Sequence, residues 1–442
     1  MEVRTLDDAP ASAFHLRLAL VAGGGPFCDG YILGVIGVVL PVLVSSFHLS
    51  ADATGLVGAA SLLGVFIGGF AGGMASDRLG RKMLYTVNIL MFTVFSAAQY
   101  FCASFDALLV WRFLIGVAIG ADYPIATAYV TEFMPRRWRG PALSGLITFW
   151  WLGYVCSFVA GYALLSFFPG NWQLVMGSSF IPSLFLLLCR SGMPESPLWL
   201  MSVGRVAEAR HIVMTFLNAD ISFEGIQSTA APGGIRQVVV KLCSPRYRGL
   251  LVFVSTFWIL QSAPAFSIHT LQAQILAQMH MNDPILVACV VTCFTFLGIL
   301  PVTFGLINLI GRRTLLIWSF VLAALSLLFI ALWSGEAGWA VLAAFIVYSA
   351  VEAAGSGLQF VYPNELFPTE IRGTAVGFAS SASRLGAALG TFLLPVGVAH
   401  FGVRVTLFFA SSLLALGAFI SWRWAPETAG LSLSEASHIT LS

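Results

Sequence analysis

Long apolar runs separated by short polar loops extend along almost the whole chain. A helix needs about 20 apolar residues to cross a bilayer, and runs of this length occupy residues 18–47, 55–75, 83–103, 107–131, 142–167 and 172–189, then 249–276, 284–309, 314–332, 339–361, 374–398 and 406–424. Backbone polar groups in hydrocarbon must be paired within their own segment, so each run is expected to be helical. The pattern predicts twelve transmembrane helices, six in each half.

The polar loops repeat between the two halves. Gly80, Arg81 and Lys82 recur as Gly311, Arg312 and Arg313; the segment from Glu132 to Pro135 recurs from Glu365 to Pro368; and Pro194, Glu195 and Ser196 recur as Pro426, Glu427 and Thr428. The offset is 231 to 233 residues in each case. Self-similarity at one fixed offset indicates a duplicated unit. We therefore predict two bundles, at residues 1–190 and 249–442, joined by a cytoplasmic linker at 191–248.

Composition and charge place this unit in a membrane. The chain is 58% hydrophobic and 10% charged, with a mean hydropathy of +0.89, which excludes an ordinary soluble domain. Nineteen of the 22 Lys and Arg residues fall in loops on one side, Arg404 falls on the other, and Arg112 and Arg384 lie inside spans. Because cation-rich loops stay in the cytoplasm, we expect a multi-pass protein of the plasma (inner) membrane with both termini cytoplasmic.

The linker contains one candidate helix. Residues 203–218 carry cations and apolar side chains at helical spacing, which predicts an amphipathic helix on the inner membrane surface. Residues 229–234 mix small residues with helix breakers and are the expected hinge. A plain connector and a regulatory helix are equally compatible with this pattern.

The loop motifs resemble those of major facilitator superfamily transporters of the sugar-porter-like branch. The resemblance rests on residues 73–82, the repeated Glu-x-x-Pro-x-x-x-Arg-Gly segments and the two Pro-Glu-Ser/Thr segments. Residues 116–124 are similar to the fourth helix of phosphate/proton symporters and of bacterial metabolite/proton symporters related to the synaptic vesicle proteins, and residues 29–31 to aromatic-acid/proton symporters. The resemblance implies an all-α integral membrane fold of twelve transmembrane helices in two pseudo-symmetric six-helix bundles.

A cytoplasmic gate is implied by the same resemblance. Its expected members are the charged residues of the repeated loops: Asp77, Arg78, Arg81, Glu132, Arg139, Glu195, Arg312, Glu365, Arg372 and Glu427. The alternative is that these residues only fix the topology of the chain in the membrane.

Charged groups inside the spans are the candidates for proton coupling, because ionisable residues at the bilayer centre are costly and usually functional. We expect Asp29 to carry the proton, Arg112 to be its counter-charge, and Asp122 to be a second titrating or gating carboxylate. The alternative is a permanent buried ion pair that only positions helices.

A second pair of charges is predicted in the other half. Glu352 and Arg384 both lie near mid-membrane and are expected to pair when the site is empty. A substrate carboxylate that displaced Glu352 would meet the guanidinium fork, which suits bidentate recognition. A static brace is the alternative reading.

The remaining candidates are aromatic and amide side chains expected to line the substrate pocket. The predicted substrate-binding residues are Tyr123, Trp150, Trp258, Gln261, Phe266, Glu352, Gln359 and Arg384. His269, near the outer end of its helix, is interpreted either as a group that titrates near neutral pH or as a hydrogen-bonding bystander. Phosphate symporters carry an acidic residue four positions after a tryptophan, but here Ser262 follows Trp258 at that distance, so phosphate is not favoured. Of the glutamines that hexose porters use, this chain has only Gln261, so hexose is not favoured either.

The sequence therefore predicts an alternating-access carrier for proton-coupled symport of a small organic metabolite, most simply a carboxylate-bearing anion. Uptake of a neutral sugar or polyol, drug/proton efflux, and a non-transporting membrane receptor remain alternatives. The cysteines are scattered without metal-ligand spacing, and no catalytic constellation is recognised, so no metal site and no enzyme are predicted. The expected partners are the substrate, protons as the coupling ion, and lipid; no cofactor and no nucleic acid are expected, and the monomer is expected to function alone.

Overall fold

The computed structural model describes residues 12–190, 192–217, 240–279, 283–333 and 338–429. Over these ranges the chain is all-α, without strands. Eleven helices in the described ranges are long and apolar enough to cross a membrane. The longest contains two crossings, as described below, so the structure confirms twelve.

The first half contains six crossings. They are formed by α1 (Ala13–Phe47), α2 (Ala51–Leu79), α3 (Arg81–Tyr100), α4 (Phe105–Phe133), α5 (Arg136–Phe167) and the pair α6 (Trp172–Gly177) and α7 (Phe180–Arg190). Side chains at the loop ends start several of them. Ser50, Ser104 and Asn171 accept hydrogen bonds from backbone N–H groups of the first turn of α2, α4 and α6.

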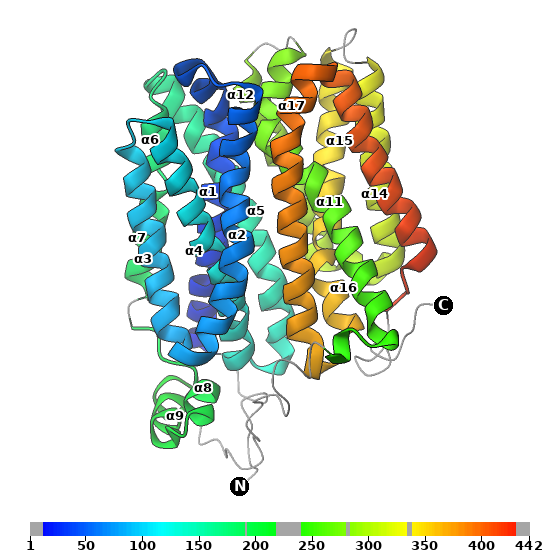
Figure 1. The fold of residues 1–442 in the computed structure, drawn as a ribbon. Coiled ribbons are helices and arrows are strands. Elements are labelled where there is room, and N and C mark those ends of the chain that lie inside the picture. The colour runs from blue at the N-terminus through cyan, green and yellow to red at the C-terminus, as the bar shows by residue number, and fades with distance from the viewer. Residues whose placement is uncertain (1–11, 191, 218–239, 280–282, 334–337, 430–442) are drawn as a thin grey trace.

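The linker forms short helices beside the first bundle. These are α8 (Pro197–Ser202), α9 (Val206–Ile212) and the π-helical turn η2 (Val213–Leu217). Figure 1 shows α8 and α9 projecting beyond one end of the transmembrane helices. Ala209 and Val213 are buried while most of their neighbours are exposed, which gives this segment the predicted amphipathic character. The expected hinge at 229–234 lies outside the described residues.

The second half repeats the arrangement. It contains α11 (Pro245–Gln278), α12 (Pro284–Pro301), η3 (Val302–Leu306), α13 (Ile307–Ile310), α14 (Arg312–Trp333), α15 (Gly338–Ser356), α16 (Leu358–Leu366) and α17 (Thr369–Trp424). α17 spans 56 residues but breaks at Gly402, whose φ of 79° and ψ of 165° are not helical. The break separates the predicted eleventh and twelfth crossings.

Glycines allow the helices to approach closely at defined points. A Cβ added to Gly68 of α2 would lie 2.0 Å from the Val117 carbonyl oxygen of α4, and one added to Gly30 of α1 would lie 1.9 Å from the Trp150 carbonyl oxygen of α5. Between the halves, a Cβ at Gly55 would lie 2.3 Å from the Phe392 carbonyl oxygen of α17. Such contacts let backbones pack directly, as is common in membrane helices.

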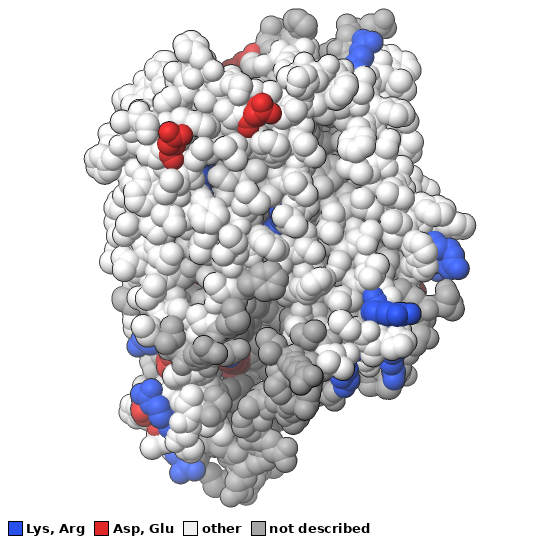
Figure 2. Space-filling view, viewed as in Figure 1, with Lys and Arg blue, Asp and Glu red and all other residues white. Residues whose placement is uncertain are grey.

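The surface matches a lipid environment. On the face shown in Figure 2, most Lys and Arg residues lie toward the end that carries α8 and α9, and the band beyond them is mostly uncharged. Large apolar side chains point outward along the helices, including Leu389, Leu393, Phe408, Phe409 and Phe419. We call the end with α8 and α9 the cation-rich end.

Candidate functional site

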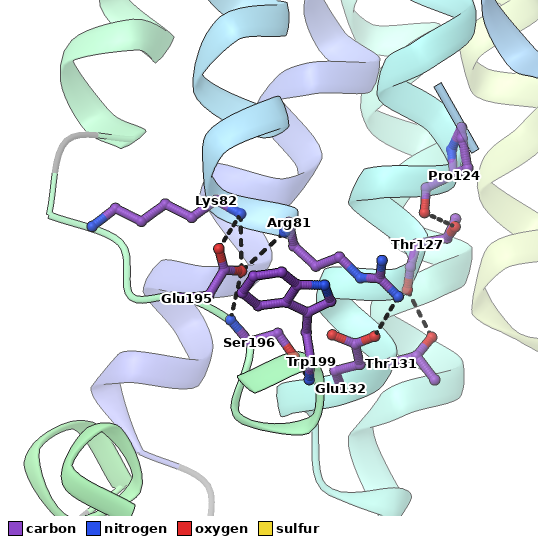
Figure 3. Close-up of polar contacts among 9 residues, drawn as sticks. All are labelled: Arg81, Lys82, Pro124, Thr127, Thr131, Glu132, Glu195, Ser196 and Trp199. Carbon is purple, nitrogen blue, oxygen red and sulfur yellow. Dashed lines mark hydrogen bonds and ion pairs between the residues drawn. The ribbon is translucent and has the colours of Figure 1, made fainter. Parts of the chain in front are cut away.

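The first repeated loop folds around the carboxylate of Glu195. Gly80 ends α2 with a φ of 92°, and α3 starts directly after it. Glu195 Oε1 accepts hydrogen bonds from the backbone N–H groups of Arg81 and Lys82, each at 3.0 Å (Figure 3). A carboxylate at exposed N–H groups of a helix start is favoured by both hydrogen bonding and the helix dipole. The Tyr129 hydroxyl donates to the Pro194 carbonyl and holds the segment that carries Glu195.

The second loop reproduces this geometry. Gly311 has a φ of 88°, and Glu427 accepts from the backbone N–H groups of Arg312 and Arg313 at 2.9 and 3.1 Å. The Tyr362 hydroxyl donates to the Pro426 carbonyl, as Tyr129 does to Pro194 in the first copy. The duplicated sequence motif is thus a duplicated carboxylate site at two helix starts.

Each loop also contains an ion pair between side chains. Arg81 Nη2 lies 3.4 Å from Glu132 Oε1, and Arg312 Nη2 lies 2.9 Å from Glu365 Oε1. Glu365 Oε2 accepts a further bond of 2.6 Å from the Thr428 hydroxyl. All four charged side chains are 14 to 17% exposed, so they are only partly screened by water.

The other expected gate residues are located as follows. Arg372 donates from Nε to the Phe367 carbonyl at 3.0 Å, which holds it at the start of α17. The side chains of Asp77, Arg78 and Arg139 lie outside the described part of the structure. The described gate residues therefore gather at the cation-rich end, in two matching clusters.

The pKa of Glu427 is affected by its position at the helix start. Burial opposes the charged form, but hydrogen bonds from the backbone N–H groups of Ala429, Arg312, Arg313 and Thr428 outweigh it and lower the pKa of Glu427 below its ordinary value of 4.5. Glu427 is therefore a fixed negative charge at neutral pH.

A buried charge cluster lies inside the first bundle. Asp122 Oδ1 of α4 lies 3.3 Å from Arg190 Nη2 of α7 and accepts a 2.9 Å bond from Asn88 Nδ2 of α3. Arg190 also donates to the Tyr85 carbonyl at 2.8 Å, and its guanidinium carbon lies 3.4 Å from the Tyr85 ring centroid. Gly25 of α1 leaves room for the pair, because a Cβ there would lie 2.1 Å from Asp122 Oδ2.

Asp29 lies beside this cluster but does not pair with Arg112 as we expected. It is 2% exposed, and Oδ1 is buried with no hydrogen-bond partner among the described residues. The charges within electrostatic range of Asp29 are Asp122, Arg190 and, from the other half, Arg384. Arg112 is instead fully buried and donates to the Ile32 carbonyl at 2.9 Å and to Ser61 Oγ at 2.8 Å. Arg112 therefore contacts α1 about one turn beyond Asp29.

Arg384 of α17 faces the first bundle, so the expected pair with Glu352 is wrong for this structure. Its guanidinium carbon lies 5.1 Å from the ring centroid of Phe266, and the charges in its range are Asp29 and the Tyr123 hydroxyl. No hydrogen bond of the Arg384 side chain is found in the described parts of the chain. Glu352 Oε2 lies 3.2 Å from His269 Nε2 of α11 instead.

The other predicted pocket residues surround these charges. Trp150 stacks on Tyr154 with ring centroids 5.4 Å apart and meets Phe266 edge-on at 6.0 Å. Gln359 Nε2 donates to Gln261 Oε1 at 3.2 Å within the second bundle. Trp258 is fully buried there, so in this conformation it belongs to the core of that bundle.

Cavities between the halves are lined by residues of both. One of about 10 Å³ is lined by Ser61, Arg112, Tyr154, Phe266 and Thr270. A larger cavity of about 160 Å³ lies at the end opposite the cation-rich end and is lined by residues of α1, α2, α11 and α17, such as Thr54, Gln274, Gln278 and Pro395.

Two functional residues escaped the sequence reasoning. Arg190 was counted among the cytoplasmic cations because it ends an apolar run, yet it is 3% exposed and folds back to Asp122. His269 is the partner of Glu352, a contact that neither of its expected roles includes. The available signal for both was the same: each is an ionisable group at or within a span, in a chain with few such groups.

Comparisons with known proteins agree with this architecture. The family model "Sugar (and other) transporter" matches residues 18–439. The inner membrane metabolite transport protein YgcS of Escherichia coli (strain K12) is 36% identical over 98% of this chain and 96% of its own. The niacin transporter NiaP of Acinetobacter baylyi is 26% identical over 95% of each chain.

Solved structures agree on the fold. The Escherichia coli xylose transporter XylE, in a partially occluded inward-open conformation, matches with a TM-score of 0.79 at 21% identity, covering 95% of this chain and all of that one. With the family match over nearly the whole length, these findings confirm the predicted fold and transporter class and exclude an enzyme. The chain is a multi-pass plasma-membrane transporter of the sugar (and other) transporter family, within the sugar-porter-like branch of the major facilitator superfamily.

Proposed function

We propose that the protein is a proton-coupled symporter of a small metabolite that carries a carboxylate. The observation that carries this proposal is Arg384, a cation deep in the membrane whose guanidinium lies over Phe266 and has no hydrogen-bond partner in the described structure. A guanidinium presents a fork of donors matched to a carboxylate. Phe266 and Trp150 beside it supply apolar faces, as small-molecule sites usually do. The similarity to NiaP, named for niacin, supports the same class of solute.

Asp29 couples this site to a proton. In the empty carrier, Asp29 and Arg384 lie within electrostatic range of each other, so each partly balances the other's charge. A substrate carboxylate on Arg384 competes for that cation. Asp29 then keeps a buried charge with less positive charge to balance it, which favours binding of a proton. Solute and proton therefore bind together, which is the requirement for symport.

Asp122 and Arg112 have supporting roles in this proposal. Asp122 has its own partners in Arg190 and Asn88, so its role in this proposal is to hold α4 against α7 and α3. Arg112 donates to the Ile32 carbonyl, about one turn along α1 from Asp29, and so holds α4 against α1.

The two loop clusters act as the cytoplasmic gate. Each ties the ends of three helices of one bundle through a carboxylate at a helix start and an ion pair. Such clusters keep each bundle rigid while the two bundles rock around the central site. In this proposal the cation-rich end is cytoplasmic, both termini lie there, and one chain is the functional unit.

The test is uptake into liposomes by purified protein, with nicotinate, benzoate, glucose and sorbitol as probes and with or without an inward proton gradient. Gradient-driven accumulation of a carboxylate is expected in the wild type, and Asp29→Asn should lose accumulation but keep exchange. Asp106→Asn, an exposed acid in the first turn of α4, is the matched control and should behave as wild type. Gradient-driven uptake that survives in Asp29→Asn would overturn the coupling role, and accumulation of glucose or sorbitol alone would overturn the anion site.

A further inference from the structure

His269 and Glu352 form a buried acid–base pair that the proposed transport cycle does not use. His269 Nε2 of α11 and Glu352 Oε2 of α15 are 3.2 Å apart, and their side chains are 6% and 4% exposed. The charge cluster of Asp29, Asp122 and Arg190 belongs to the first bundle, whereas this pair belongs to the second. We infer that His269 and Glu352 form a second proton-binding site that holds one shared proton.

The surroundings of the pair are aromatic. Trp151 and Tyr154 of α5 meet the His269 ring edge-on at 5.6 and 6.1 Å, and Tyr348 of α15 lies 6.1 Å from it. α1 approaches the His269 carbonyl at Gly37, where a Cβ would lie 3.2 Å from that oxygen. The titratable groups that face the pair from these elements are thus the two tyrosines, and neither supplies a positive charge.

The cations nearby are engaged elsewhere. Arg384 interacts with Asp29 and Tyr123, and Arg112, which lines the small cavity beside Tyr154, donates to Ile32 and Ser61. Loss of the proton would leave the pair as a neutral histidine and a bare carboxylate in an aromatic enclosure. A buried charge without a partner is strongly unfavourable, so the closed site retains one proton, carried either as an imidazolium–carboxylate pair or as two neutral groups.

Unpartnered polar atoms point to a site that exchanges its proton rather than a permanent brace. His269 Nδ1 and the hydroxyls of Tyr154 and Tyr348 are buried without hydrogen-bond partners among the described residues. Buried polar groups are normally satisfied. Three such groups around one acid–base pair leave hydrogen-bonding positions through which water or solute can contact the pair.

The location links the pair to movement between the bundles. Trp151 Nε1 of the first bundle donates to Ser356 Oγ, one helical turn after Glu352, at 3.2 Å. Separation of α5 from α11 and α15 would remove the aromatic cover and expose the pair to water. Proton release is therefore coupled to opening, and this inference extends the proposed symport by a second proton.

The test is a potentiometric titration of the purified protein in unbuffered detergent between pH 5 and 9, without solute or gradient. Glu352→Gln is expected to move the midpoint of one released proton per molecule, because His269 then holds its proton without the carboxylate. Glu208→Gln is the matched control: it removes an exposed acid of α9 whose pKa is lowered by its hydrogen bond from Arg205, so it stays ionised across this range. Asp29→Asn should leave the Glu352-dependent shift in place, and Asp29→Asn/Glu352→Gln should show both changes.

A release curve of Glu352→Gln with the same midpoints as wild type would overturn the second site. If Glu352→Gln does not fold, His269→Gln is used in its place and should move the midpoint of one released proton. An unchanged titration curve of His269→Gln would also overturn the inference. Because this titration needs no transport, its failure is distinct from failure of the symport proposal, which Asp29→Asn decides in the uptake assay.

Discussion

Arg190 Nη2 and Asp122 Oδ1 lie 3.3 Å apart with side chains only 1% and 0% exposed, so the interior of the first bundle contains a buried ion pair. The pair joins α7 to α4, and Asn88 joins α3 to the same carboxylate. Removal of one member leaves the other charged and buried. Such a loss costs about 3–5 kcal/mol.

We therefore expect Arg190→Gln to lower the thermal unfolding temperature in detergent sharply. Asp122→Asn/Arg190→Gln should recover part of the loss, because neither neutral amide leaves an uncompensated charge. The exposed pair Arg205 and Glu208 provides the control, since solvent screens exposed pairs and Arg205→Gln should have little effect. If Arg190→Gln were as stable as wild type, the pair would not be structural.

The transmembrane helices could be predicted from the sequence, whereas the contacts of the buried charged residues could not. Each span depends on about 20 consecutive residues, a local property, and all twelve crossings are present in the structure. The repeated loop motifs were also visible in the sequence, but their contacts were not, because Glu195 and Glu427 accept hydrogen bonds from helix starts that lie 114 and 115 residues away in the chain. The partners of Arg112, Glu352 and Arg384 were not predicted. These contacts depend on how each helix is rotated about its own axis. A shift of one residue along the helix points a side chain toward a different neighbour.

The buried position of Arg190 could not be predicted from the sequence either. A cation at the end of an apolar run normally extends to the aqueous side, as the positive-inside pattern assumes. Here Asp122, Asn88 and the Tyr85 ring provide a better environment inside the bundle. That environment is assembled from α3 and α4, so only tertiary structure reveals it.

The close approach of α1 and α5 predicts a second effect on stability. Gly30→Ala places a methyl group where the Trp150 carbonyl oxygen lies, at 1.9 Å from the added Cβ, and the two backbones must separate. Overpacking of this kind costs about 1–3 kcal/mol. Gly145→Ala is the matched control: nothing lies within 4 Å of its Cβ, and alanine is favoured over glycine in a helix by about 0.5–1 kcal/mol. Thermal unfolding should show opposite signs for the two variants, and equal signs would contradict this packing.

The carboxylate site at the second loop predicts a pH-dependent effect. The pKa of Glu427 is lowered in the folded protein, against the tendency of burial, by backbone N–H donors that include those of Arg312 and Arg313. A lowered pKa means that the stabilisation is complete above the ordinary value of 4.5 and is lost as the pH falls through the folded-state value. Wild type should therefore unfold at a higher temperature than Glu427→Gln at neutral pH, and the gap should close in acid. A gap of constant size from neutral pH to below 4.5 would show that the charge of Glu427 is not what stabilises the loop.

The role of Arg384 yields the sharpest functional prediction. Arg384→Gln removes the cation beside Phe266 but keeps a shorter polar side chain, so the fold should survive while the carboxylate loses its partner. Loss of a charge-assisted bidentate contact costs about 1.5–3 kcal/mol, which corresponds to roughly 10- to 150-fold weaker binding of a carboxylate solute. Arg384→Lys keeps the charge without the fork and should fall between the two, since lysine is a point charge.

The measurement for Arg384 is uptake of nicotinate and benzoate beside their uncharged amides, nicotinamide and benzamide. If Arg384 recognises the carboxylate, the variant loses preference for the acids over the amides, and the amides are transported as before or better. Asp29 supplies an internal check, because without Arg384 it has lost its cross-bundle cation and coupling to the proton gradient should weaken together with selectivity. Retained preference for the acids in Arg384→Gln would assign anion recognition to another cation, and Arg112, which lines the cavity between the halves, would be the next to test.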